Sequence, residues 1–196
     1  MSEGPDATPL PRNRYVAFFL VAAAGLAADL ISKEIVFSWP GKLTGQVVYW
    51  WWPDHAGIQT SLNEGALFGI GYGQVGLFAV ISLVAAVAIP LWLFVGGAAR
   101  DWWITIALGA VMAGVLGNLY DRLGMHGLKW PEWDPRAGEA VYAVRDWILW
   151  RASADWTWPN FNLADAFLVT GAAVLFLRAM LEPKEEASPE ADGPTA

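Results

Sequence analysis

The sequence has no cysteine, and only two of its 196 residues are histidines. The lack of cysteine excludes disulfide bonds, a thiol nucleophile and any thiolate metal site. His55 and His126 both lie in loop-like stretches without a partner at ligand spacing, whereas a zinc site needs about three or four protein ligands. The sequence therefore predicts a protein with no bound metal and no cofactor.

Charge is also scarce, and much of the acidic excess lies at the end of the chain. Charged residues make up 16% of the sequence, and the formal net charge is -7. Residues 182–196 are acidic and rich in proline, alanine and serine, and residues 1–13 contain three prolines. Such compositions are typical of disorder. We therefore predict disordered tails over 1–13 and 182–196 around one membrane domain over 14–181. The acidic balance argues against nucleic acid as a partner.

Apolar residues, in contrast, make up 56% of the sequence, above the roughly 45–50% of an average soluble domain. A membrane-spanning helix needs about 20 mostly apolar residues. The first suitable stretch is too long for a secretory signal and carries Asp29 and Lys33 near its far end. Four windows qualify as spans, at residues 15–37, 75–97, 102–121 and 161–181.

The lengths of the connecting segments predict the topology. The segments 38–74 and 123–160 are long and share one side of the membrane, while both termini share the other. Alternating apolar residues in 38–74 predict a small sheet on the membrane surface. The predicted fold is an all-α membrane protein with four transmembrane helices and a small extramembrane sheet between the first two helices. Basic residues number five on one side and seven on the other, so the positive-inside rule does not orient the chain.

Ionisable residues at membrane depth are costly, so each suggests a function. Asp29 and Lys33 stand four residues apart and can pair on one helix face. They fit either a structural ion pair or a direct role with substrate. Asn63 precedes a glycine-rich stretch. Its amide can hold an extended substrate backbone, although asparagine and glycine are also ordinary turn residues.

Two further polar groups lie at predicted helix ends. Asn118, Asp121 and Arg122 end the third helix, where spacings of three and four residues place them on one face. A helix C-terminus explains Arg122 but not the whole set. Asn162 and Asp165 open the fourth helix and share a face. They fit a helix N-cap as well as a functional group.

Two aspartates suggest a particular chemistry. Asp146 lies between apolar flanks, and a chain that folds back can bring its carboxyl group to that of Asp165. Two close carboxyl groups share a proton, because both cannot ionise cheaply. One then acts as general base on water and the other as general acid, as in an aspartic peptidase. A proton-coupled carrier is the alternative, since intramembrane carboxylates also serve proton relays.

Taken together, the motifs resemble the lipoprotein signal peptidase family, also called signal peptidase II. The matching pieces occur in the family's order and are Asp29 with Lys33, Asn63-x-Gly65-Ala66-x-Phe68-Gly69, Gly117-Asn118-x-x-Asp121-Arg122, Val144-x-Asp146-Trp147 and Phe161-Asn162-x-Ala164-Asp165. The family is an intramembrane aspartyl endopeptidase. It removes the signal peptide from diacylglyceryl-modified prolipoproteins and cuts just before the lipidated cysteine.

The resemblance implies roles, partners and a location. The catalytic pair would be Asp146 and Asp165, and Asn63 and Arg122 would bind substrate. The supporting polar network would be Asp29, Lys33, Asn118, Asp121 and Asn162. The implied partners are diacylglyceryl prolipoproteins and membrane lipids. The implied location is the bacterial cytoplasmic (inner) membrane, with cytoplasmic termini and the active site at the outer face. Segment 38–74 would be the family's surface-lying cradle of strands.

The chain departs from the family pattern in two places. An extra stretch at about 125–142 follows the third helix. It leaves Asp134 and Asp155 as alternatives for the first catalytic carboxyl group, although the flanks favour Asp146.

The second departure lies in the glycine-rich motif. Glu64 and Leu67 stand where the family pattern suggests small or apolar, alanine-like residues. We expect them to affect substrate fit and not the chemistry.

Overall fold

The computed structural model describes residues 9–39, 45, 47–65 and 71–181. Residues 1–8 of the predicted N-terminal tail at 1–13 lie outside these residues, and so do the predicted C-terminal tail at 182–196 and the part of the glycine-rich motif at 66–70. The first helix begins at Arg12, inside the stretch predicted to be disordered.

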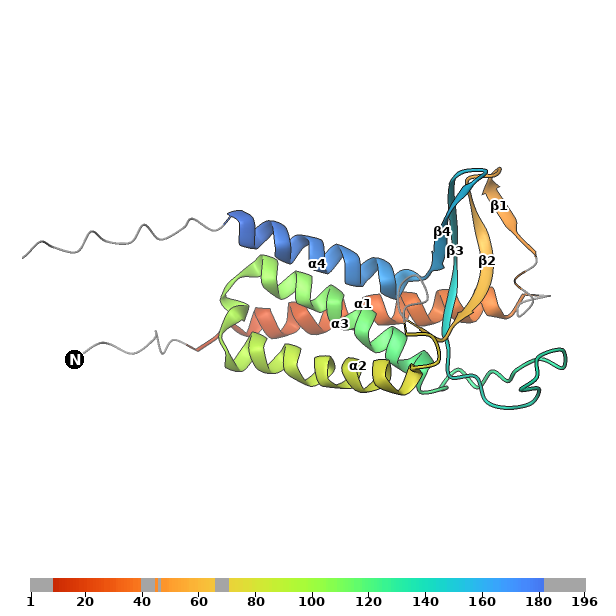
Figure 1. The fold of residues 1–196 in the computed structure, drawn as a ribbon. Helices are drawn as coiled ribbons and strands as arrows, with labels where there is room; N and C mark the ends of the chain where they lie inside the picture. Colours follow the sequence, from red (N-terminus) through yellow and green to blue (C-terminus); the bar gives the residue numbers. More distant parts are fainter. Residues whose placement is uncertain (1–8, 40–44, 46, 66–70, 182–196) are drawn as a thin grey trace, which may run out of the picture.

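Four long apolar helices run side by side and form the body of the molecule (Figure 1). They are α1 (Arg12–Phe37), α2 (Val75–Pro90), α3 (Trp102–Arg122) and α4 (Leu163–Leu181). Two short elements connect α2 to α3, the π-helical turn η2 (Leu91–Val95) and the 3-10 helix η3 (Ala98–Arg100). With α2 counted through η2, all four helices are long and apolar enough to cross a membrane. The four predicted spans are therefore confirmed.

The central helix of the bundle is α3. Of its most apolar 18-residue stretch, 61% is buried inside the molecule, against 6% for the corresponding stretch of α2. Small residues permit this close packing. A Cβ atom on Gly109 would press against Val21 of α1, and one on Gly117 would collide with the carboxylate of Asp29. These two glycines of α3 therefore face α1, and Gly117 lets a charged group approach the α3 backbone.

A four-stranded antiparallel sheet lies at the end of the bundle opposite the start of α1 and the end of α4 (Figure 1). Its strands, in spatial order, are β1 (Tyr49–Trp52), β2 (Ala56–Asn63), β3 (Val144–Ser153) and β4 (Trp156–Phe161). The first two come from the segment between α1 and α2, where a sheet was predicted, and that prediction is confirmed. The other two come from the segment between α3 and α4, so the sheet is larger than the sequence indicated.

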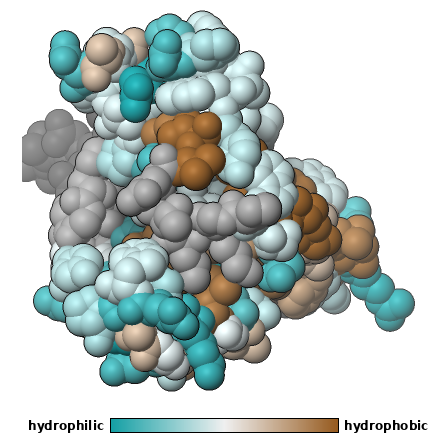
Figure 2. All heavy atoms as spheres, turned by 90° about the vertical axis from the view of Figure 1, so that its right-hand side faces the viewer, coloured by the Kyte–Doolittle hydropathy of each residue, from teal (hydrophilic) through white to brown (hydrophobic). Residues whose placement is uncertain are grey.

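The end of the molecule that carries the sheet is mostly hydrophilic or intermediate over its described residues, with a hydrophobic patch near its centre (Figure 2). The strands also expose tryptophans, namely Trp51, Trp52, Trp150 and Trp156. Tryptophan favours the headgroup layer of a membrane. This composition fits a sheet that lies at the membrane surface.

The register of the sheet brings distant motifs together. Ser61 of β2 pairs with Asp146 of β3, and Asn63 pairs with Val144. The last strand, β4, leads into α4 through Asn162. As a result, Asp146 and the start of α4 both lie where the sheet meets the bundle.

The stretch between α3 and β3 forms a loop that extends past the bundle (Figure 1). Lys129 and Ala140 form an antiparallel β-bridge, and the Trp130 N–H donates to the Glu139 carbonyl at 2.9 Å. At the base of the loop, Val141 is fully buried. The extra stretch at 125–142 therefore has an internal structure and an anchored base.

Candidate active site

Asp146 is nearly buried, with 2% of its surface exposed, and both of its carboxyl oxygens accept hydrogen bonds from amides. Oδ1 accepts from the side chain of Asn162 at 2.6 Å, and Oδ2 accepts from the side chain of Asn63 at 3.1 Å. Burial, and after it the nearby charge of Asp165, raise the pKa of Asp146 to about 8. This shift favours a proton on the pair at neutral pH.

Asp165 lies in the first turn of α4, where it exchanges hydrogen bonds with Asn162. The Asn162 Oδ1 accepts from the Asp165 N–H at 3.0 Å, and the Asp165 Oδ2 accepts from the Asn162 N–H at 3.2 Å. This reciprocal pattern is a capping box. The N-cap interpretation of the sequence is thus correct, but it is not complete. The second oxygen of Asp165 accepts from the Asn118 side chain at 2.8 Å.

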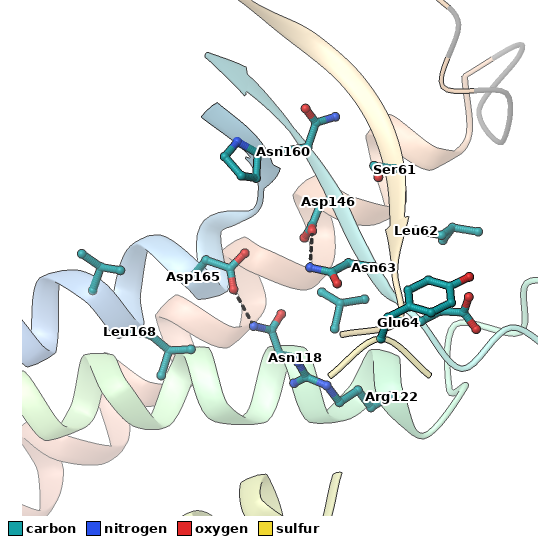
Figure 3. A pocket seen from close by; sticks show the side chains of 14 residues that line it. Ser61, Leu62, Asn63, Glu64, Asn118, Arg122, Asp146, Asn160, Asp165 and Leu168 are labelled. Carbon is teal, nitrogen blue, oxygen red and sulfur yellow. Dashed lines mark hydrogen bonds between the residues drawn. The ribbon is translucent and has the colours of Figure 1, made fainter. Parts of the chain in front are cut away.

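Asn162 joins the two aspartates. Its side-chain nitrogen donates to Asp146 Oδ1 and also to the Asn118 Oδ1, at 2.6 and 3.2 Å, while its backbone and Oδ1 hold Asp165. Figure 3 shows Asp146 and Asp165 on the same cavity, with Asn63 and Asn118 bonded to one each. The structure therefore brings together the two carboxyl groups and the three asparagines that the sequence motifs contain.

A buried ion cluster lies behind this site. Asp29 and Lys33 are fully buried, and the Lys33 Nζ lies 2.7 Å from Asp29 Oδ2 and 3.1 Å from Asp121 Oδ2. Lys33 also donates to Asn118 Oδ1 at 3.2 Å. The Asp29 Oδ1 accepts the Ala164 N–H at 2.9 Å, which satisfies a free donor at the start of α4. These contacts favour the structural interpretation of the Asp29 and Lys33 pair.

Arg145 completes the cluster, although its role was not predicted from the sequence. Its side chain is 2% exposed, and its Nε and Nη2 lie 3.0 and 2.9 Å from Asp121 Oδ1. Its backbone N–H donates to Asp121 Oδ2 at 2.9 Å, and its Nη1 lies 3.2 Å from Glu34. Arg145 thereby ties β3 to the end of α3 directly before Asp146. Its position directly before Asp146 in the sequence is the signal that could have identified it.

Asn63 and Arg122 meet at Gly65, which begins the glycine-rich motif. The Asn63 Oδ1 accepts the Gly65 N–H at 2.9 Å, and Arg122 Nη2 donates to the Gly65 carbonyl at 3.3 Å. The turn interpretation of Asn63 is therefore correct, and the same side chain also holds Asp146. The Arg122 guanidinium lies 5.4 Å from the Phe78 ring centroid.

An open cavity of about 570 Å³ connects these groups (Figure 3). Its lining combines polar groups of β2, α3, β3 and α4 with apolar side chains of α4. The polar lining includes Asn63, Glu64, Asn118, Arg122, Asp146 and Asp165.

The two alternative aspartates lie elsewhere. Asp134 accepts from the Arg136 Nε at 3.0 Å inside the loop, and this pairing lowers the pKa of Asp134. Asp155 is exposed in the turn between β3 and β4. Among the described residues, the aspartates that line the cavity are Asp146 and Asp165.

Four membrane spans and two carboxyl groups on one cavity are the features of a membrane aspartic peptidase. Comparison with known proteins gives the family. The family model described as signal peptidase (SPase) II matches residues 21–181, and the chain belongs to this aspartic peptidase family. The predictions of family and enzyme class are therefore confirmed.

Two relatives agree with this assignment, and a solved structure shares the fold. The chain is 51% identical to a lipoprotein signal peptidase of Rhodopirellula baltica, over 86% of this chain and 74% of that protein. It is 30% identical to a lipoprotein signal peptidase of Sinorhizobium fredii, over 92% of each. A bacterial membrane enzyme solved by the in meso method at 2.3 Å resolution has the same fold, with a TM-score of 0.67, 23% identity, and coverage of 87% of this chain and 93% of that one.

Proposed function

We propose that Asp146 and Asp165 are the catalytic pair of this signal peptidase and that it cleaves diacylglyceryl-modified prolipoproteins just before the lipidated cysteine. One observation carries the assignment. The two carboxyl groups line one cavity and are joined through Asn162. Family membership supports a prolipoprotein substrate.

The two aspartates share one proton at neutral pH and titrate as a unit. The raised pKa of Asp146, caused by burial and then by Asp165, supports this state. The ionised carboxylate takes a proton from water, and the water oxygen attacks the scissile carbonyl carbon. The protonated carboxyl group donates a hydrogen bond to the carbonyl oxygen. As the C–N bond breaks, the aspartate pair passes a proton to the leaving amine.

The substrate backbone lies along the cavity beside Asn63 and Arg122. The Nη2 of Arg122 already contacts a backbone carbonyl, that of Gly65, at 3.3 Å, and an extended substrate offers the same acceptor. The acyl chains of the substrate lie against the apolar helices among membrane lipids. Burial of these chains contributes about 0.8 kcal/mol per CH₂.

The protein resides in the bacterial cytoplasmic membrane, with both termini in the cytoplasm and the cavity at the outer face. Two observations support a cavity at the membrane surface on the side away from both chain ends. The sheet, which contributes to the cavity lining, lies at the end of the bundle opposite the start of α1 and the end of α4, and the exposed tryptophans of the sheet suit a headgroup layer. The choice of the outer face is what the family resemblance implies.

A gel-shift assay on purified enzyme in detergent tests the proposal. We expect wild type to release the signal peptide from a lipidated prolipoprotein and not from the unlipidated form. Asp146→Asn and Asp165→Asn should each fall by about 10²–10⁴-fold, the usual contribution of an acid or base. Asp134→Asn is the matched control and should keep cleaving at a rate within about tenfold of wild type. Turnover by either site variant near the wild-type rate contradicts the pair, and equal cleavage of the unlipidated form contradicts the substrate.

A further inference from the structure

The loop at 125–142 carries an arginine whose position is fixed on several sides. The Arg136 Nε and Nη2 donate to the two carboxyl oxygens of Asp134, at 3.0 and 3.3 Å, and the Arg136 N–H donates to Asp134 Oδ1 at 2.9 Å. The guanidinium also lies over the Trp130 ring, 3.6 Å from its centroid, in a cation–π contact. Arg136 is therefore held in one orientation before it meets anything outside the loop.

From this position Arg136 reaches the cavity wall. Its remaining nitrogen, Nη1, lies 2.7 Å from Glu64 Oε1. Glu64 lines the cavity, and it is one of the residues that depart from the family pattern. The extra loop thus supplies a partner for Glu64, the residue that departs from the family pattern. The Tyr72 side chain also bonds Glu64.

The neighbours of Glu64 contact the proposed catalytic groups. On one side, Asn63 donates to Asp146 Oδ2 at 3.1 Å. On the other, Gly65 binds the Asn63 side chain through its N–H and the Arg122 guanidinium through its carbonyl. A shift of Glu64 therefore moves two residues whose hydrogen bonds set the cavity geometry.

We propose that Arg136 is a positioning residue, which acts through Glu64 to hold the turn at residues 63–65 against Asp146 and Arg122. This inference rests on the proposed function of Asp146. The side chain of Arg136 is 37% exposed and that of Glu64 is 15% exposed. Exposed ion pairs contribute little to stability, so the effect of this one falls on geometry, where small displacements are costly for catalysis.

A double-mutant cycle tests the proposal. Arg136→Gln and Glu64→Gln should each lower kcat by roughly tenfold. The KM for lipidated substrate should change by a smaller factor than kcat, and the melting temperature should change little. The double variant should be no worse than either single variant, because both changes break one contact. Arg136→Lys keeps the charge and should recover part of kcat. Lys129→Gln, which removes an exposed charge from the same loop, should match wild type.

Two results would overturn the proposal. One is a double variant whose loss is the product of the two single losses, because the residues then act independently. The other is unchanged kcat in Arg136→Gln.

Hydrogen exchange provides a readout that does not depend on cleavage. Arg136→Gln should accelerate exchange at the Gly65 amide, and Lys129→Gln should not. If wild type fails to cleave but Arg136→Gln still accelerates this exchange, the contact between loop and turn stands and the proposed function fails. Unchanged exchange at Gly65 contradicts the proposed contact whatever the activity.

Discussion

The molecule has two groups of buried acids, and their partners differ. Asp29 and Asp121 pair with Lys33 and Arg145 at distances of 2.7 to 3.1 Å. In the described part of the chain, the partners recorded for Asp146 and Asp165 are instead amide side chains and a backbone N–H. Acids paired with cations organise the fold, whereas acids held by neutral donors are the ones that we propose to exchange a proton. Neighbours, and not residue type, thus separate the structural aspartates from the proposed catalytic pair.

Removal of the lysine from the ion cluster should have the largest effect. Lys33→Met leaves Asp29 without its cation in a fully buried site, and breaking a buried pair costs about 3–5 kcal/mol. We expect a clear fall in melting temperature in detergent. Combining Lys33→Met with Asp29→Asn should recover part of it, because Arg145 still pairs Asp121. An equal melting temperature for Lys33→Met and wild type would contradict the structural role of the cluster.

The asparagine that joins the proposed catalytic acids should matter next, and mainly for rate. Asn162→Ala removes the 2.6 Å bond to Asp146 and half of the capping box. Hydrogen bonds to charged groups contribute about 1.5–3 kcal/mol, so we expect a fall in kcat of roughly 10- to 100-fold. Asn160→Ala is the control, because Asn160 lines the same cavity but donates to the Gln59 carbonyl. Equal kcat in the two variants would refute the linking role of Asn162.

The pH dependence sharpens the contrast further. Activity should fall as pH rises through about 8, because Asp146 then loses the proton that the pair shares.

Between about pH 4 and 8 the folded protein holds a proton at Asp146 that the unfolded chain releases, so the free energy of unfolding declines with rising pH. Asp146→Asn should show a shallower decline. Kinetics and melting curves from pH 5 to 9 provide both readouts, and full activity at pH 9 would contradict the shared proton.

The smallest effects should come from the aspartates outside the cavity. Asp155→Asn changes an exposed turn residue and should leave kcat and stability at wild-type values. Asp134→Asn frees Arg136 from one partner and should lower kcat by less than about tenfold, since Glu64 and Trp130 still hold the arginine. A loss in either variant as large as that of Asp146→Asn would reopen the choice of catalytic carboxyl group.

The four helices were predictable because each needs only a local apolar run. The contact of Asp29 with Lys33 was equally local, since four residues make one helical turn. β3 and β4 were missed because their pairing is non-local. Asp146 lies opposite Ser61, which is far away in the sequence, and the apolar flanks of Asp146 fit a membrane surface without specifying a strand.

The site was predictable as a set of residues more than as a geometry. Aspartates and asparagines at helix ends indicated a polar network, but not that Asn162 joins two acids. Arg145 and Arg136 were missed as functional candidates because loops commonly carry basic residues. Their importance comes from partners in other segments, Asp121 and Glu64.

The anchoring of α4 affects how the protein fits bilayers of different thickness. The start of α4 is bonded to Asp29 and to its own capping box, so a slide or tilt of this helix would pull Asp165 out of place. The helix α2 has no buried residue over Val75–Pro90, so fewer packed side chains fix its position. Hydrophobic mismatch costs only fractions of a kcal/mol per Å, which is enough to reorient a loosely packed helix. We therefore expect adaptation to a thinner or thicker membrane to fall mainly to α2, while the start of α4 keeps its depth.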